Sequence, residues 1–185
     1  MYKCYVDTET TGLSPDYASL LEIAAVIIDD EGSIIDTFHE YINPGRKIPE
    51  EIVNITHITD SKVADCRREG PVLADFVTWL KGYGVITIVA YNAPFDMKFL
   101  RSRSDLWKLD HPFYDMDVID PMKTVGALLK SGALVTEKTP SGRKSKKQES
   151  VAKALGISYG DGGAHSAIED VTVLYKIHKK LQEMV

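Results

Sequence analysis

The stretch Tyr2-Lys3-Cys4-Tyr5-Val6-Asp7-Thr8-Glu9-Thr10-Thr11-Gly12 begins as an apolar strand and ends with two carboxylates ahead of a glycine. In an extended strand, residues i and i+2 point to the same face, so we expect Asp7 and Glu9 to project side by side. Two anions held together at the end of a buried strand repel each other unless a cation lies between them. Taken alone, such a pair more often marks a strand that ends in a solvated turn. Residues elsewhere in the chain are needed to choose between a cation site and a solvated turn.

Length and composition predict one ordinary domain over residues 1–185, since the 185 residues are 44% hydrophobic. The net charge of −5 neither suggests nor excludes nucleic acid, whose usual footprint is a basic face. The two cysteines lack metal-binding spacing, which favours a reduced compartment. The chain shows no leader and no apolar run near the ~18 residues of a membrane span, so we expect a soluble cytoplasmic protein without a membrane partner.

Periodicity predicts an α/β fold with a mixed sheet. Buried strands are expected at 20–28 and 85–90, a hairpin strand at 33–42 and a short strand at 118–119. Helices are expected at 49–54, from Pro71 to Gly82, after Asp96, from Pro121 to Gly132 with Asp120 as its N-cap, and at the C-terminus. Strands first, followed by strands alternating with helices, indicate an antiparallel meander joined to parallel strands.

The stretch 136–147 has no periodicity and is interpreted as a mobile basic loop. Its basic residues are Lys138, Arg143, Lys144, Lys146 and Lys147. A run of charge is more often only a solvated loop, but these side chains are also suited to follow a phosphate backbone electrostatically.

Two further acidic residues are candidates for the same site as the first pair. Asp96 follows a buried strand at a helix start, and Asp170 lies in the last helix. Each alone is more typical of a helix cap or a solvated helix face. In one continuous helix His165 and Asp170 would lie about 140° apart, so we expect His165 to come from the glycine-rich loop before that helix.

Together, three segments resemble the ordered motifs of the DnaQ-like (DEDDh) 3′–5′ exonuclease family, which includes proofreading subunits of DNA polymerases and RNA-processing enzymes. They are Asp7-Thr8-Glu9-Thr10-Thr11-Gly12, Asn92-Ala93-Pro94-Phe95-Asp96 and His165-Ser166-Ala167-Ile168-Glu169-Asp170. The resemblance implies an RNase H-like mixed five-stranded sheet flanked by helices.

The resemblance also implies a catalytic set of five residues: Asp7, Glu9, Asp96, His165 and Asp170. The four carboxylates would hold two Mg²⁺ or Mn²⁺ ions, which suits phosphodiester hydrolysis and oxygen ligands. His165 would be the general base for the attacking water, and the products would be nucleoside 5′-monophosphates.

By position in the family, six residues are predicted to contact substrate: Thr10, Leu13, His57, Ile58, Asn92 and Phe95. The apolar ones would stack on or wedge between terminal bases. Ordinary core packing explains Leu13 and Ile58 equally well and Phe95 better. His57 is as consistent with a surface histidine as with a phosphate contact.

The sequence therefore predicts a metal-dependent exonuclease that acts on the 3′ end of single-stranded or frayed DNA. The alternative is an exoribonuclease, because a site that reads the backbone and stacks bases accepts either sugar. A non-catalytic module that docks to a polymerase or repair complex is disfavoured because all five family residues are retained. Since the last helix runs to Val185, we expect no tethering tail, and a repair, phage-encoded or RNA-processing enzyme is as consistent as a proofreading subunit.

Overall fold

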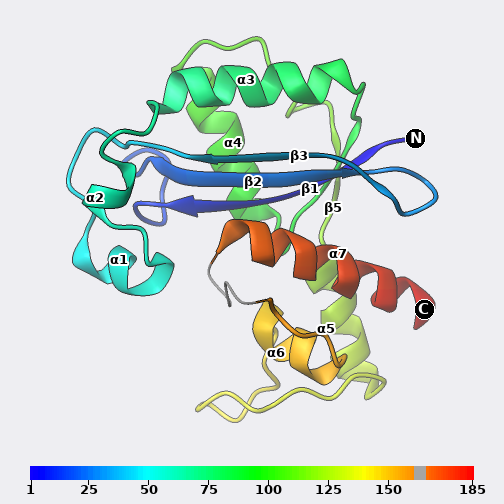
Figure 1. Cartoon of the computed structure of the whole chain (residues 1–185). Helices are drawn as coiled ribbons and strands as arrows, with labels where there is room; N and C mark the ends of the chain where they lie inside the picture. The colour runs from blue at the N-terminus through cyan, green and yellow to red at the C-terminus, as the bar shows by residue number, and fades with distance from the viewer. Residues whose placement is uncertain (161–165) are drawn as a thin grey trace.

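A five-stranded mixed sheet with helices on both faces forms the core of the computed structural model, which describes residues 1–160 and 166–185 (Figure 1). The strands are β1 (Lys3–Thr10), β2 (Leu20–Ile28), β3 (Ile34–Tyr41), β4 (Thr87–Val89) and β5 (Asp117–Ile119). Their order across the sheet is β3-β2-β1-β4-β5, so β1 is central. β1 pairs antiparallel with β2 and parallel with β4, which confirms the predicted change from meander to parallel strands.

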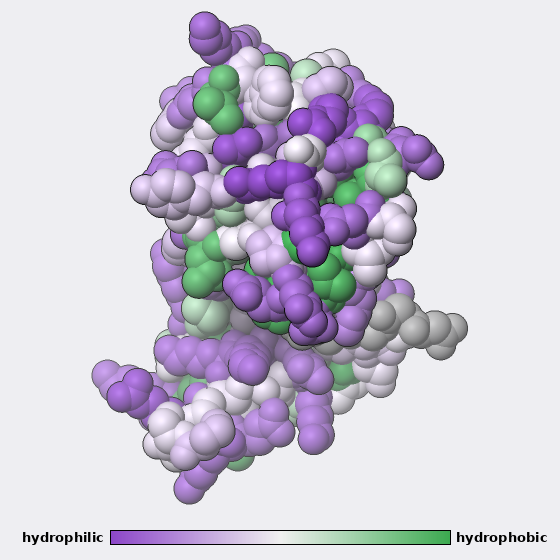
Figure 2. All heavy atoms as spheres, turned by 90° about the vertical axis from the view of Figure 1, so that its left-hand side faces the viewer, coloured by the Kyte–Doolittle hydropathy of each residue, from purple (hydrophilic) through white to green (hydrophobic). Residues whose placement is uncertain are grey.

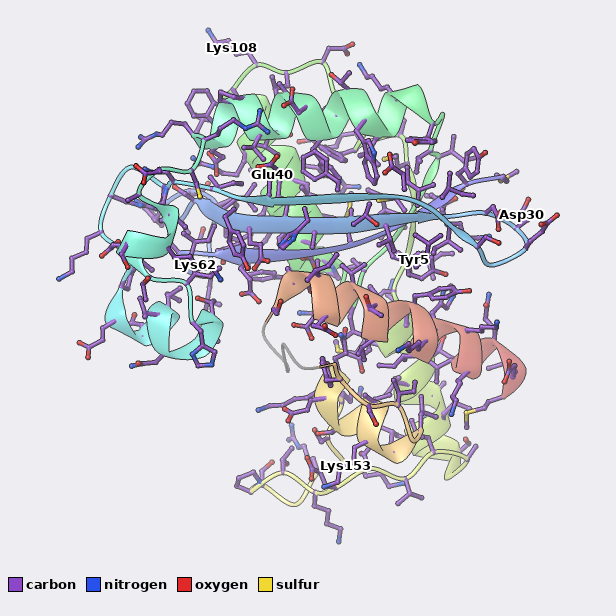
Figure 3. The ribbon with its side chains drawn as sticks, viewed as in Figure 1. Tyr5, Asp30, Glu40, Lys62, Lys108 and Lys153 are labelled. Carbon is purple, nitrogen blue, oxygen red and sulfur yellow. The ribbon has the colours of Figure 1, made fainter. Side chains whose placement is uncertain are left out.

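The two faces of the sheet are covered by different helices. Above it in Figure 1 lies α3 (Glu69–Gly82), and α4 (Pro94–Leu106), which shares a core with α3, runs from there behind the strands. Below the sheet lie α7 (Ala167–Glu183) and, farther down, α5 (Pro121–Ser131) and α6 (Gln148–Ala154). The alternation of β1 explains this, since Cys4 and Val6 join the core beneath α3 and α4. Tyr5 points to the opposite face, where it packs in the α7 core and its hydroxyl lies 2.8 Å from His178 Nδ1 (Figure 3).

The short helices α1 (Glu50–Thr56) and α2 (Asp60–Val63) lie at the end of the sheet where β1 stops (Figure 1). α1 runs two residues beyond the predicted helix at 49–54, ending at His57, which has a left-handed φ of 58°. Thr59 caps α2 by accepting a hydrogen bond from Lys62 N.

Helix α5 begins and ends where the sequence predicted. Asp120 is its N-cap and accepts from Met122 N, and Gly132 ends it with a left-handed φ of 84°. Asp120 also accepts from Asn92 N at 3.0 Å, so it ties the end of β4 to the start of α5. None of the helices within residues 1–160 and 166–185 combines the length and apolar character that a membrane crossing requires.

Candidate active site

Three of the predicted carboxylates converge at the carboxyl end of the central strand. One carboxylate oxygen from each of Asp7, Glu9 and Asp170 lies within 4.8 Å of the other two. Asp7 and Glu9 share a face of β1, as the i, i+2 spacing predicted. Asp170 reaches them because it lies on the same helical face as Ala167, Val171 and Leu174, which pack on the sheet. With 8% of its surface exposed, Asp170 does not lie on a solvated helix face.

Asp96 approaches this cluster from the first turn of α4 and is held by Thr8. Its Oδ1 accepts from Thr8 N at 3.0 Å and from Thr8 Oγ1 at 2.8 Å. Only 3% of Asp96 is exposed. It stands outside the group of three oxygens but close enough that its charge raises the pKa of Asp7. Thr8, between the two acidic residues of β1, therefore fixes the fourth carboxylate.

Burial and mutual repulsion make these carboxylates difficult to ionise. Burial, and then the charges of Asp96, Glu9 and Asp170, hold the pKa of Asp7 well above its usual range. Burial and neighbouring carboxylates raise the pKa of Glu9 to about 8. Burial raises the pKa of Asp96 to about 7, although the hydrogen bonds from Thr8 lower it in part. A cluster of anions at this density fits a divalent cation, and its all-oxygen donors suit a hard one such as Mg²⁺ or Mn²⁺.

A fifth buried acid faces the site, and sequence reasoning missed it. Glu22 lies directly across the β1–β2 ladder from Glu9, is 1% exposed and contributes to the raised pKa of Glu9. Its Oε1 is 2.6 Å from His39 Nε2 on β3. The available signal was a lone glutamate inside an otherwise apolar strand.

Two side chains that the sequence did not indicate hold Asp170 in place. The Tyr159 hydroxyl donates to Asp170 Oδ1 at 3.0 Å. Gln148 Nε2 donates to the Asp170 carbonyl oxygen at 2.8 Å and to Oδ1 at 3.2 Å. Partners of this kind orient a ligating carboxylate. Neither residue belongs to the three motifs, and no local pattern would have marked them.

The four carboxylates open into a cavity of about 620 Å³, a size typical of small-ligand sites. Besides them it is lined by side chains of three regions: the Tyr91–Phe95 turn, α5 and the segment from Thr139 to Tyr159. The lining residues are Asp7, Thr8, Glu9, Tyr91, Asn92, Phe95, Asp96, Met122, Thr139, Ser145, Lys146, Lys147, Gln148, Glu149, Tyr159 and Asp170.

Of the residues predicted to contact substrate, the structure brings two to this cavity. Asn92, exposed and with a left-handed φ of 60°, and the partly buried Phe95 both line it. Thr10 and Leu13 do not line it: Thr10 is buried with its hydroxyl bonded to the Gly12 carbonyl oxygen, whereas Leu13 is 79% exposed.

The other two predicted contacts lie on the α1–α2 segment, outside the cavity lining. His57 is exposed at the end of α1. Ile58 is 1% exposed and packs with Leu21, Ile48 and Val63. Of the two roles that the sequence left open for Ile58, the structure therefore shows core packing. The buried side chain has no exposed face on which a base could stack. His165 lies outside the described residues.

The structure is a mixed sheet whose central strand ends in a carboxylate cluster completed from two helices, the arrangement that the resemblance implied. The exonuclease family model RNase_T matches residues 5–178. The chain therefore belongs to this DnaQ-like exonuclease family.

Relatives by sequence include DNA polymerase III PolC-type of Staphylococcus haemolyticus (strain JCSC1435), 46% identical over 94 residues, and that of Staphylococcus aureus, 44% identical over 94 residues. Each match covers 51% of this chain but only 6% of the polymerase.

Solved structures with the same fold include E. coli Exonuclease I in complex with a dT13 oligonucleotide, with a TM-score of 0.76 and 22% identity over 98% of this chain and 41% of that one. The nuclease domain of 3′hExo, a DEDDh family member bound to rAMP, has a TM-score of 0.76 and 23% identity over 98% of this chain and 92% of that one. At these identities the likeness is one of fold.

Proposed function

We propose that the protein removes nucleotides one at a time from the 3′ end of single-stranded or frayed DNA and releases nucleoside 5′-monophosphates. The observation that carries this is the convergence of Asp7, Glu9 and Asp170 within 4.8 Å, beside Asp96, at the base of a cavity open to a ligand. The whole chain, residues 1–185, is taken as one exonuclease domain.

Asp7, Glu9, Asp96 and Asp170 would hold two divalent ions, Mg²⁺ or Mn²⁺. When bound, such ions stabilise the charge that develops on the attacking and leaving oxygens of a phosphodiester. Thr8, Tyr159 and Gln148 keep the ligating side chains in position through the hydrogen bonds described above. His165 would take the proton of the attacking water, an assignment that rests on the family motif.

For the substrate itself, Asn92 and Phe95 are the best supported contacts because both line the cavity. Leu13, which is 79% exposed, would offer a face on which a base could stack, and Thr10 would act through its backbone. DNA is favoured because the relatives by sequence are DNA polymerases and one structural neighbour was solved with dT13. RNA remains the second candidate because 3′hExo was solved with rAMP. A polymerase or repair complex is the proposed setting.

The test is hydrolysis of matched DNA and RNA oligonucleotides labelled at the 3′ or the 5′ end, in Mg²⁺, Mn²⁺ or EDTA. Asp7→Asn and His165→Ala should each lose most activity, while Asp115→Asn, an exposed carboxylate outside the cavity, should keep it. Cleavage that survives EDTA, or a fully active Asp7→Asn, would refute the metal site. Full activity of His165→Ala at every pH would refute only the assignment of the base.

A further inference from the structure

The basic stretch 136–147 is folded into an ordered turn. Lys138 and Lys144 form an antiparallel bridge, Thr139 N donates to Arg143 O at 2.7 Å, and Ser145 N donates to Glu137 O at 2.8 Å. Gly142 closes the turn with a φ of 79°, which favours glycine. We call residues 136–147 the basic turn. Its backbone hydrogen bonds give its charges defined places, where the sequence predicted a mobile loop.

The basic turn is anchored to the wall of the active site. The Tyr91 hydroxyl donates to Lys146 O at 2.6 Å, and Ser145 Oγ donates to Ser150 Oγ on α6 at 2.8 Å. Thr139, Ser145, Lys146 and Lys147 all line the cavity that contains the four carboxylates. The turn therefore forms part of the cavity rim, and Figure 1 shows it extending from below α6 toward the side where β1 ends.

One of its five cations, Lys144, and its acid, Glu137, already have hydrogen-bond partners within the protein, and a second cation, Lys146, lies against α5. Lys144 Nζ donates to Leu129 O at the end of α5 at 2.7 Å. Lys146 Nζ lies against α5, 3.1 Å from where a Cβ on Gly126 would stand. Glu137 accepts from Ser150 Oγ at 2.8 Å and lies 4.0 Å from Lys153 Nζ, which reaches toward the turn from α6 (Figure 3).

The other three cations, Lys138, Arg143 and Lys147, are exposed. None of the ion pairs formed by residues 1–160 and 166–185 includes Lys138, Arg143 or Lys147. This is notable in a chain whose net charge is −5. Figure 2 looks onto the side toward which β1 ends, and the lower part of that face, at the level of α6 and the basic turn, is largely hydrophilic.

We propose that Lys138, Arg143 and Lys147 bind the phosphates of a single strand whose 3′ end lies in the active site. The inference rests on the proposed function and extends it to the strand beyond the cleaved nucleotide. A polymer held by its end must leave the cavity over the rim, and Lys147 stands on that rim. Lys147 contacts the phosphate nearest the cavity, and the other two contact phosphates farther toward the 5′ end. Contacts of this kind read charge, so DNA and RNA are bound alike.

The test is equilibrium binding of a fluorescent single-stranded oligodeoxynucleotide of about 16 nucleotides, measured by anisotropy in EDTA between 50 and 200 mM salt. The variant is Lys138→Ala/Arg143→Ala/Lys147→Ala. The matched control, Lys123→Ala/Lys176→Ala/Lys179→Ala, removes the same charge from exposed positions outside the cavity. The variant Lys138→Arg/Lys147→Arg keeps the charge and should bind as the wild type does.

Each phosphate contact on a single strand contributes about 0.7 to the slope of log affinity against log salt. Losing three should reduce the slope by about 2, so over this fourfold salt range the wild type loses about 18-fold more affinity than the variant. The control should keep the wild-type slope. The proposal would be overturned if Lys138→Ala/Arg143→Ala/Lys147→Ala kept the wild-type slope, or if the control variant lost as much of the slope. An acidic protein would then remain as the partner of the turn.

A second measurement separates this proposal from the proposed function. Hydrolysis of a nitrophenyl ester of thymidine 5′-monophosphate involves no upstream phosphate, so its rate should be equal in the wild type and in the control Lys123→Ala/Lys176→Ala/Lys179→Ala, whose positions lie outside the cavity. An inactive wild type would refute the proposed function while the binding comparison still decides the role of the turn. Complete loss of this activity in Lys138→Ala/Arg143→Ala/Lys147→Ala would show that the substitutions disturb the site itself, which would also overturn the proposal.

Discussion

Removing divalent ions should make the protein less stable as the pH rises from about 5 to about 8. In the folded protein Asp7, Glu9 and Asp96 have raised pKa values, near 8 for Glu9 and near 7 for Asp96. In the unfolded chain they return to ordinary values of 3.8 for aspartate and 4.5 for glutamate. Across this window the folded state therefore binds more protons than the unfolded state. The free energy of unfolding must then decrease as the pH increases.

The size of the effect follows from the number of retained protons. Each extra proton on the folded state changes the free energy of unfolding by about 1.4 kcal/mol per pH unit. If the site keeps one to two protons near pH 6, the slope is about −1.4 to −2.7 kcal/mol per unit. Over two pH units that is about 3 to 5 kcal/mol, a large part of the 5–15 kcal/mol typical of a domain.

The assay is urea unfolding followed by circular dichroism in EDTA at several pH values, with a parallel series in excess Mg²⁺. Ion binding requires the ionised carboxylates, so the Mg²⁺ series should be flatter and more stable at pH 8. Glu9→Gln should remove one retained proton and flatten the EDTA series, while the exposed Glu51→Gln should not. If the free energy of unfolding of the wild type in EDTA stayed constant or rose with pH, the carboxylates would not have raised pKa values in the folded protein, and this reasoning would be refuted.

Three further predictions concern side chains that support the site or the sheet. Tyr159→Phe removes the hydroxyl that donates to Asp170 and should raise the Mg²⁺ concentration needed for half-maximal activity about 10-fold or more, measured by titration. Thr8→Val removes one of the two hydrogen bonds that lower the pKa of Asp96, so the acid limb of the pH–rate profile should move to higher pH. Glu69→Gln weakens the ion pair between Glu69 and Arg103. Because Glu69 is only 4% exposed, this change should lower the free energy of unfolding in urea by about 3 kcal/mol.

Each of these predictions has a control and an outcome that contradicts it. Tyr17→Phe alters a tyrosine that is 82% exposed and should leave the Mg²⁺ requirement unchanged. An unshifted acid limb in Thr8→Val would mean that Asp96 does not titrate in that range during turnover. For the unfolding experiment the exposed Glu51→Gln is again the control and should keep the wild-type stability. If Glu69→Gln were as stable as the wild type, the ion pair between Glu69 and Arg103 would contribute little to stability.

The residues that the sequence predicted well are those whose signal is local. Asp7 and Glu9 share a face because a strand has a period of two, and Asp120 and Gly132 bound α5 through rules that involve only their neighbours. Asp170 was identified through its motif, because its place in the helix was equally typical of a solvated side chain.

The residues that the sequence did not predict act through partners far away in the chain. Glu22 faces Glu9 only because of the register of the β1–β2 ladder, and Gln148 meets Asp170 across 22 positions. Ile58 was assigned to substrate or core with equal support, since an apolar residue in a loop looks the same in both roles until its neighbours are known.

The divalent ions and the basic turn are expected to act on different parts of the bound strand, for electrostatic reasons. Four carboxylates at the base of the cavity repel a phosphodiester, so a strand cannot place its end there until the site's negative charge is neutralised. The basic turn lies on the same rim and attracts the strand without approaching the cluster's centre. We therefore expect binding of long strands to persist in EDTA, whereas occupancy of the cavity by the terminal nucleotide requires the ions. An end-labelled fluorophore quenched only when Mg²⁺ or Mn²⁺ is present would separate the two events, and quenching that is independent of the ions would contradict this order.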